Sequence, residues 1–346
     1  MTLLGFQPDP DFNRLRTALF CRQPDRVPLA ELWIDAPVKE AILGRHIGNS
    51  FVDPDYDVEA DIDFMYGAGY DYVHVEPRYS FPMKPGLEVP ENAGTVLNWA
   101  DFADYPWPTI ADVDFHWLDR AVQYLPSGMG IITGTSGIFE AAWRITGFTT
   151  FCLLMHDQPD LVAAIMQRVG ALLLQIFERG AAFPRVGAMW ISDDIAYASG
   201  PMLPPAFYRQ HLFPWYRQMA DICRQRDLPF LYHSDGLLWK VLPDLIAAGF
   251  NAIQPIEPKV MDIVELKRQV GDRLCLIGNI DLGYTLTRGT PAEVEAEVRE
   301  RIRTVGPGGG YCVGSSNTVT YYVPPQNYIA MIEATRRYGK YPLEGV

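Results

Sequence analysis

The tripeptide His233-Ser234-Asp235 is the sharpest chemical feature of the sequence, and it directly follows the short apolar run 229–232. Side chains two residues apart on a strand point the same way, so the imidazole of His233 and the carboxyl of Asp235 are expected to share one pocket. Two interpretations stay open. His233 and Asp235, together with Glu257 after the next apolar run, could bind a divalent metal such as zinc. Alternatively, the same three residues perform metal-free acid–base catalysis.

Polar and aromatic side chains also gather at or just after the ends of the other apolar runs. Taken singly, several of them are explained as helix caps. Taken together, they place titratable groups in one cleft, where shifted pKa values are expected, and aromatic rings there suit a planar ligand. We therefore predict a substrate-binding set of Trp33, Asp35, His74, Glu76, Trp190, Asp193, Asp194, Asn279, Asp281, Ser316 and Asn317.

A repeated strand-then-helix pattern explains why these positions are expected to lie close together. Eight short runs without polar alternation read as parallel strands buried on both faces: 27–34, 72–75, 130–133, 186–191, 229–232, 252–255, 274–277 and 311–314. Amphipathic stretches between them predict helices over 57–66, 161–180, 204–226, 237–248, 291–304 and 325–338. The alternation predicts an α/β fold, a (β/α)8 TIM barrel with its active site at the carboxyl ends of the strands.

One segment breaks the alternation. Residues 77–108 are rich in Pro, Gly and acidic residues and follow the second predicted strand. A long insertion there would rise over the barrel mouth as a lid or substrate-binding loop. A surface decoration is the plainer alternative. We expect the whole chain, 1–346, to form a single barrel domain.

The charge and composition of the chain limit the kinds of molecule that it is expected to bind. The formal net charge of −13 disfavours nucleic acid and anionic lipid, so we expect a small-molecule substrate. The five cysteines show no Cys-x-x-Cys spacing, and we read neither a signal peptide nor an apolar run of membrane-spanning length. These features predict a cytoplasmic protein without a membrane partner, and a homodimer is a common assembly for such enzymes.

Several of these motifs resemble the uroporphyrinogen decarboxylase (URO-D) superfamily. The resemblance lies in Arg26-Val-Pro, Tyr232-His-Ser-Asp-Gly236, Pro255-Ile-Glu-Pro258, Gly278-Asn-Ile-Asp281 and the stretch starting Val323-Pro-Pro-Gln-Asn-Tyr. It spans nearly the whole chain and is strongest from Trp190 onward. It implies a (β/α)8 barrel and either a uroporphyrinogen decarboxylase or a methyltransferase linked to corrinoid or coenzyme M.

The resemblance favours the methyltransferase branch. True decarboxylases carry Arg-Gln-Ala-Gly-Arg near the N-terminus, whose arginines bind substrate carboxylates, whereas this chain has Leu-Ala-Glu-Leu-Trp-Ile-Asp after Pro28. The methyltransferases bind zinc through His-x-Cys and a later Cys. His233 matches the first ligand, but Asp235 stands at the first cysteine and Asn317 lies nearest the later one.

The resemblance therefore implies transfer of a methyl group between a small methoxylated or methylated substrate and a cobamide (corrinoid) or tetrahydrofolate carrier. The chemistry resembles corrinoid-dependent O-demethylation, with a corrinoid protein as a partner. Two alternatives stay open: a uroporphyrinogen decarboxylase-like lyase, which needs no cofactor, and a non-catalytic protein that binds a corrinoid or tetrapyrrole.

Overall fold

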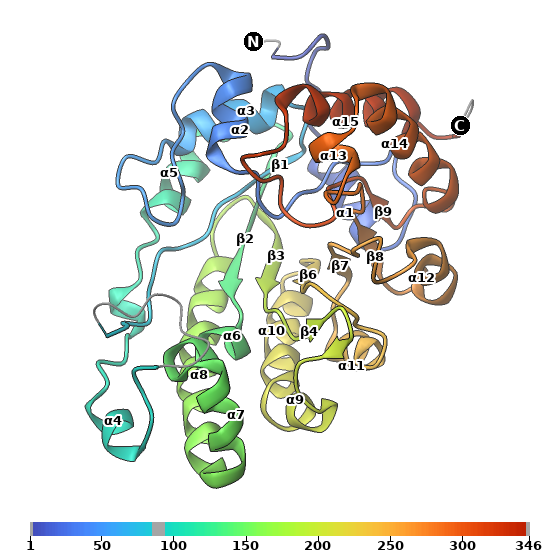
Figure 1. Ribbon diagram of the computed structural model, residues 1–346. Helices are drawn as coiled ribbons and strands as arrows, with labels where there is room; N and C mark the ends of the chain where they lie inside the picture. Colours follow the sequence, from blue (N-terminus) through green and yellow to red (C-terminus); the bar gives the residue numbers. More distant parts are fainter. Residues whose placement is uncertain (1–2, 85–93, 344–346) are drawn as a thin grey trace.

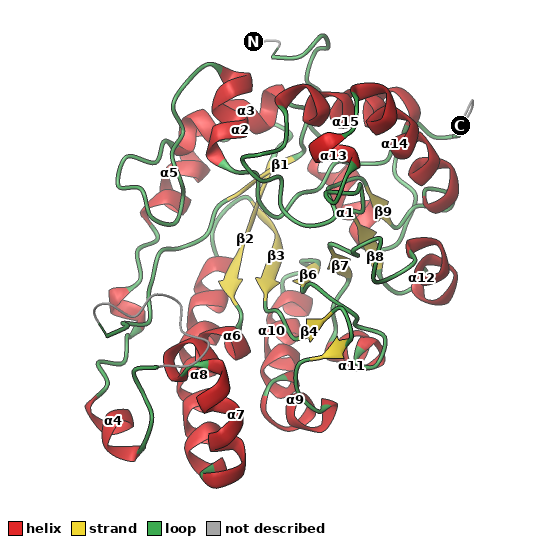
Figure 2. Cartoon of the chain, in the orientation of Figure 1, coloured by secondary structure: helices red, strands yellow, loops and turns green. Residues whose placement is uncertain are grey.

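The computed structural model describes residues 3–84 and 94–343 of the chain. Seven parallel strands form one curled sheet in the order β1-β2-β3-β6-β7-β8-β9. Helices lie outside it (Figures 1 and 2). The strands are β1 (Tyr72–His74), β2 (Gly130–Ser136), β3 (Val186–Ser192), β6 (Phe230–His233), β7 (Ala252–Gln254), β8 (Cys275–Ile277) and β9 (Tyr311–Cys312). An antiparallel pair, β4 (Ala196–Tyr197) and β5 (Gly200–Pro201), follows β3. This barrel-like α/β fold agrees with seven of the predicted strands.

The helices follow the predicted alternation with strands. They are α1 (Phe12–Leu19), α2 (Ala36–Leu43), α3 (Val58–Gly67), α4 (Trp99–Asp104), α5 (His116–Tyr124), α6 (Ile138–Thr146), α7 (Phe148–Asp157), α8 (Pro159–Ala181), α9 (Pro205–His211), α10 (Phe213–Gln225), α11 (Leu242–Ala248), α12 (Ile263–Val270), α13 (Thr285–Arg288), α14 (Pro291–Val305) and α15 (Pro325–Tyr338), with a 3-10 turn at Ile110–Asp112. Asp57 caps α3 through Ala60 N, and Thr290 with Glu293 forms a capping box on α14.

Two predicted helices differ from the structure. The stretch 204–226 divides into α9 and α10 at Leu212, next to Pro214, whose ring cannot continue a helix without losing a backbone hydrogen bond. The stretch 237–248 becomes helical only at Leu242.

Helix α8 is long and apolar enough, by length and composition, to cross a membrane. The sequence had predicted no apolar run of that length. It packs against β2, β3, α6 and α10, and much of its apolar surface is buried there. Its composition is therefore explained by its place as a core helix.

The first predicted strand, 27–34, is the main correction to the fold. This segment is extended and runs parallel to β9 through isolated bridges at Leu29–Val313 and Ile34–Val319. Toward β1, the Tyr72 hydroxyl accepts from Glu31 N–H at 2.7 Å and donates to Glu31 O at 2.6 Å. Because one side chain occupies both backbone groups of Glu31, they cannot form a ladder with β1.

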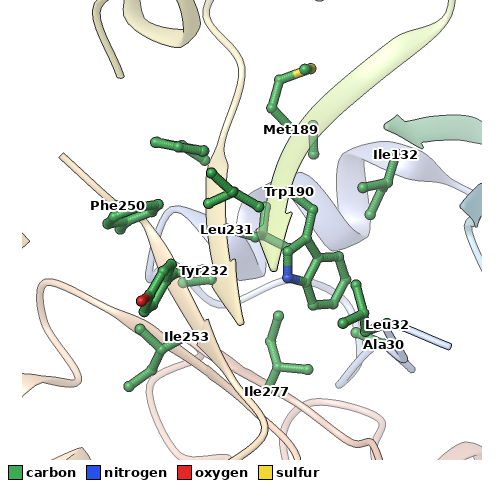
Figure 3. Close-up of a cluster of buried hydrophobic side chains, with 14 of the residues drawn as sticks. Ala30, Leu32, Ile132, Met189, Trp190, Leu231, Tyr232, Phe250, Ile253 and Ile277 are labelled. Atoms are coloured by element: carbon green, nitrogen blue, oxygen red, sulfur yellow. The ribbon is translucent and has the colours of Figure 1, made fainter. Parts of the chain in front are cut away.

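The interior of the curl is filled by large side chains rather than by a pore. Trp190 is fully buried, and its indole points toward Ala30, Leu32 and Ile277 in Figure 3. Trp190 has no hydrogen-bond partner for its Nε1 among the described residues, and its role in substrate binding stays a prediction. It packs beneath the site.

The predicted insertion 77–108 is described only in part, since residues 85–93 lie outside the described residues. Before that gap, Arg78 holds the segment against the loop before α3 by donating to Ser50 O at 2.6 Å and Asp53 O at 2.8 Å. After it, the Tyr105 hydroxyl donates to Pro82 O at 2.8 Å. That contact joins the two described parts of the segment, and Thr95 and Val96 N–H, which donate to Ile145 O at 2.6 and 3.0 Å, hold the second part to α6. The lid role stays a prediction.

We expect Tyr72→Phe to lower the free energy of unfolding by about 1–3 kcal/mol, because it leaves two buried backbone groups of Glu31 without partners. Chemical denaturation followed by circular dichroism measures this. Tyr66→Phe is the matched control, since Tyr66 is only half-buried and makes no side-chain hydrogen bond among the described residues. Equal, small effects from both changes would contradict the importance of this contact.

Candidate active site

Three side chains with metal-ligand chemistry meet where β3 and β6 end. One ligand atom each from Asp194, His233 and Asp235 lies within 4.8 Å of the others. The strands bring them together because Ser192 pairs with His233, which places Asp194 beside the start of the next loop. His233 Nε2 lies 3.8 Å from Asp194 Oδ1, and the same oxygen accepts the backbone N–H of Asp235 at 2.8 Å.

The orientation of His233 is fixed by an amide on the neighbouring strand. Gln254 Nε2 donates to the carbonyl oxygen of Asn317 at 2.8 Å, and a carbonyl can only accept. Gln254 Oε1 therefore faces His233 Nδ1 as an acceptor, and Nδ1 carries the proton of the neutral ring. The lone pair is left on Nε2, the atom that faces the carboxylates, as in histidines that bind metals.

Asp235 supplies a second atom whose lone pairs are free to bind a ligand. Asn317 Nδ2 donates to its Oδ2 at 2.6 Å, whereas its Oδ1 is buried with no hydrogen-bond partner among the described residues. Burial raises the pKa of Asp235 to about 6, and the nearby carboxylates of Asp194 and Glu257 add to this while His233 opposes it. An imidazole lone pair beside an unpaired buried carboxylate oxygen and a second carboxylate fits a divalent cation.

The positioning chain continues from Asn317 to Glu31, deep under the site. Ser315 Oγ lies 2.7 Å from Glu31 Oε2 and 2.9 Å from Asn317 O, while Ser315 N–H donates to Glu31 Oε1 at 2.6 Å. A serine hydroxyl has one proton and cannot donate to both oxygens. Burial raises the pKa of Glu31 to about 8, so the protonated carboxyl can donate to Ser315, whose own proton goes to Asn317.

A cavity of about 540 Å³ lies at the ends of β1, β2 and β3, and its described lining does not include Asp194, His233 or Asp235. Its polar lining includes Glu76, Ser136, Glu140 and Ser192. Glu140 links the cavity to the cluster, because its carboxylate accepts the backbone N–H of Asp194. Burial and the charge of Asp194 raise the pKa of Glu140.

A smaller cavity of about 230 Å³ lies beside it. Its lining includes Glu31, Asp35, His74 and the buried Lys39–Asp61 ion pair, whose Nζ–Oδ1 distance is 2.8 Å. Trp33 lines both cavities. Four predicted substrate-binding residues, Trp33, Asp35, His74 and Glu76, therefore line one or both of these spaces.

Asp193 is a correction to the predicted substrate-binding set. It is fully buried, and its carboxylate accepts the backbone N–H groups of Phe139 and Glu140, each at 2.9 Å, and the Tyr216 hydroxyl at 2.6 Å. It caps the first turn of α6 and has no free position for a ligand. Burial raises its pKa to about 7.

Other predicted residues hold loops in place through backbone N–H groups. Glu257 accepts from Gly236 at 2.7 Å, Ser316 from Leu282 at 3.0 Å, Asp281 from Gly283 at 2.8 Å, and Asp35 from Tyr321 at 2.8 Å. Glu257 lies outside the compact cluster, in which Asp194 is the third group. Asn279 is buried, with its Oδ1 unpartnered among the described residues.

Sequence reasoning missed Gln254, Glu31 and Glu140. Gln254 is the last residue of β7, so the strand-end rule that selected its neighbours would also have found it. Glu31 stands alone as an acid inside an apolar run, which is itself a sign of a buried role. Glu140 lies inside helix α6, and its approach to Asp194 has no local signal.

We expect Glu31→Gln to flatten the pH dependence of stability between about pH 5 and 8. The pKa of Glu31 is raised on folding, so its contribution to stability is largest at low pH and is lost as pH rises through about 8. Glutamine reproduces the neutral acid, with an acceptor for Ser315 N–H and a donor for Ser315 Oγ. Urea unfolding of both proteins across this window measures the difference.

In the same series, Glu333→Gln is the control, because Glu333 is exposed. If the difference in free energy of unfolding between the natural protein and the Glu31→Gln variant did not change with pH, Glu31 would be ionised in the folded state. The assignment of a proton to the Glu31 carboxyl would then be wrong.

Comparison with known proteins agrees with the fold and the motifs. The family model described as "Uroporphyrinogen decarboxylase (URO-D)" matches residues 80–338. Uroporphyrinogen decarboxylases from Coxiella burnetii and Nitrosospira multiformis are 24% and 25% identical over 201 and 282 residues, which cover 56% and 78% of this chain. These matches span 52% and 72% of the two relatives, so the chain spans about half the length of the first.

A solved structure titled "methyltransferase from Methanosarcina mazei" has the same fold. Its TM-score is 0.72 at 17% identity, and the match covers 95% of this chain and 99% of that one. Since the family model covers well over half of the residues, the chain belongs to the uroporphyrinogen decarboxylase family.

Proposed function

We propose that this protein is a methyltransferase of the URO-D superfamily that moves a methyl group between a small methylated or methoxylated substrate and a corrinoid or folate carrier. The observation that carries the proposal is the Asp194–His233–Asp235 cluster, which keeps a lone pair on Asp235 Oδ1 without a partner among the described residues and is linked to the large cavity through Glu140. The Methanosarcina mazei methyltransferase of the same fold supports it.

The charge of the cavity disfavours a substrate with many carboxylates, such as uroporphyrinogen. Among the described residues of its lining, Arg144 is the one Lys or Arg, and it donates to Glu140 at 2.9 Å, so its charge is already matched. A polycarboxylate would also approach Glu76 and Glu140, and like charges held close in a poorly solvated site are costly. The sequence similarity to curated decarboxylases still favours decarboxylation as the second candidate function.

Asp194, His233 and Asp235 would hold a divalent metal such as zinc. When bound, the ion would act as a Lewis acid toward the atom that loses its methyl group. The protein's own part is orientation: Gln254 presents the Nε2 lone pair of His233, and Asn317 fixes one oxygen of Asp235. If no metal is held, the raised pKa of Asp235 lets that carboxyl donate a proton to the departing oxygen or nitrogen.

We also propose that one barrel domain spans residues 1–346, closed by the extended segment before α2, with residues 77–108 over its mouth. The small-molecule substrate would enter under that segment, and a corrinoid protein would be the partner that delivers or accepts the methyl group. We infer a cytoplasmic enzyme, and a homodimer is the expected assembly.

We expect Co²⁺ to bind the metal-free protein, and Asp194→Asn or Asp235→Asn to weaken binding at least about tenfold. Glu333→Gln, on the exposed surface, is the control and should bind Co²⁺ as the natural protein does. Glu257→Gln tests the third ligand predicted from the sequence, whose charge acts on Asp235, and should weaken Co²⁺ binding less than the two Asp→Asn changes do. Visible absorption of Co²⁺ during titration measures the affinity. Because ligands must be deprotonated, affinity should fall as pH drops below about 6. If Glu257→Gln alone weakened Co²⁺ binding, the metal site would have to be assigned to Glu257 instead of the cluster.

We expect the purified protein to methylate cob(I)alamin from a panel of methoxylated and N-methylated donors, and Asp235→Ala to lower kcat by about 100-fold. The absorbance change from cob(I)alamin to methylcobalamin measures turnover. A cobalamin-binding protein without catalysis would show no turnover and unchanged cobalamin affinity in the variant. Decarboxylation of uroporphyrinogen at enzyme-like rates, without methyl transfer, would establish the second candidate instead.

A further inference from the structure

The lining of the cavity of about 540 Å³ combines two kinds of side chain. Aromatic rings come from Trp33, Phe51, Tyr79 and Phe81, and carboxylates come from Glu76 and Glu140. This combination restricts the kind of group that can fill the space.

The aromatic rings are set at right angles to one another in pairs. Trp33 and Phe51 have ring centroids 4.3 Å apart at 71°, and Tyr79 and Phe81 have centroids 6.4 Å apart at 89°. Tyr79 is held in place because its hydroxyl lies 2.8 Å from Ser136 Oγ and accepts Ser136 N–H at 2.9 Å. All four rings also line the cavity, and aromatic rings around a cavity attract a cation that carries methyl groups.

Glu76 contributes a buried acceptor that lacks a donor. Its side chain is 7% exposed, and its Oε1 makes no hydrogen bond among the described residues. The nearest polar atom is His74 Nε2 at 3.3 Å, which is also unpartnered. His74 Nδ1 lies 2.9 Å from the carbonyl oxygen of Leu32 and must carry the ring proton, so Nε2 of the neutral ring is an acceptor too.

Two buried acceptors that face each other need a proton donor between or beside them. A second proton on His74 would supply one, but it would also cancel the negative charge of Glu76. A ligand N–H would supply one and keep that charge. Arg144 offers no free cation to an anionic ligand, because it already pairs with Glu140.

We propose that this cavity binds a methylated ammonium group: a protonated amine whose N–H meets Glu76 and whose methyl groups contact the rings of Trp33, Phe51, Tyr79 and Phe81. The inference rests on the proposed function in one respect, since it names the substrate class that the methyltransferase would use. The binding preference itself requires neither metal nor methyl carrier.

Three probes of similar size separate the possibilities: N,N-dimethylbenzylammonium, neutral benzyl methyl ether and anionic phenylacetate. Isothermal titration calorimetry is carried out on the full chain without metal or carrier. We expect the cation to bind at least about tenfold more tightly than the ether, and the anion to bind most weakly.

Glu76→Gln should reduce the affinity for the cation about tenfold and leave the affinity for the ether nearly unchanged. Phe81→Leu, which keeps the carboxylate but removes a ring face, should reduce the affinity for the cation by several-fold. Glu333→Gln, on the exposed surface, is the matched control and should bind the cation as the natural protein does. Thermal unfolding by circular dichroism checks that each variant folds, and Phe81→Leu keeps the test valid if Glu76→Gln does not.

Equal or tighter binding of the ether would overturn the proposal and would mean that His74 carries the second proton. Tighter binding of phenylacetate would overturn it as well. The proposed function can fail separately: methyl transfer from a methoxylated donor without cation preference would leave that function standing and remove this inference. Preferential binding of the cation without methyl transfer from any donor would leave this inference standing and remove the proposed function.

Discussion

A chain of hydrogen bonds running from Glu31 through Ser315, the Asn317 carbonyl and Gln254 to His233 is the interaction on which the rest of the site depends. It starts in the extended segment that lies between β1 and β9, where Tyr72 holds both backbone groups of Glu31. The contacts that bring the two edges of the curled sheet together therefore also set the direction of the imidazole. Each link has one geometry that satisfies every donor, so the chain behaves as a single unit.

Burial gives the acids around this chain different tasks. Burial raises the pKa of Glu31 to about 8, which lets its carboxyl donate at neutral pH, whereas Asp193 gives both its oxygens to the first turn of α6 and the Tyr216 hydroxyl. Asp235 keeps one oxygen free, and its neighbours Asp194 and His233 lie close enough to share a ligand. The same acidic groups would repel a polycarboxylate, and the proposals of a metal ion and of a positively charged substrate both rest on that negative charge.

The candidate site could be predicted in outline because the carboxyl ends of parallel strands face one edge of a sheet. His233 and Asp235 follow from two-residue alternation, and Trp33, Asp35, His74 and Glu76 from the ends of the first two predicted strands. Adjacent acids such as Asp193 and Asp194 could not be told apart, because one turns into α6 and the other toward His233. Glu257 looked equivalent to them, yet it holds the backbone of Gly236 instead.

The sequence by itself determined the alternation of strands and helices, the membership in the family and the strand-end positions from which chemistry is possible. These follow from local hydrophobic periodicity and from short motifs, which need no knowledge of distant neighbours. Only the tertiary structure decided which polar groups meet: that Gln254 orients His233, that Glu31 lies beneath Ser315, and that Trp190 fills the core. Those outcomes depend on hydrogen bonds and packing between residues far apart in the chain, whose partners no local pattern specifies.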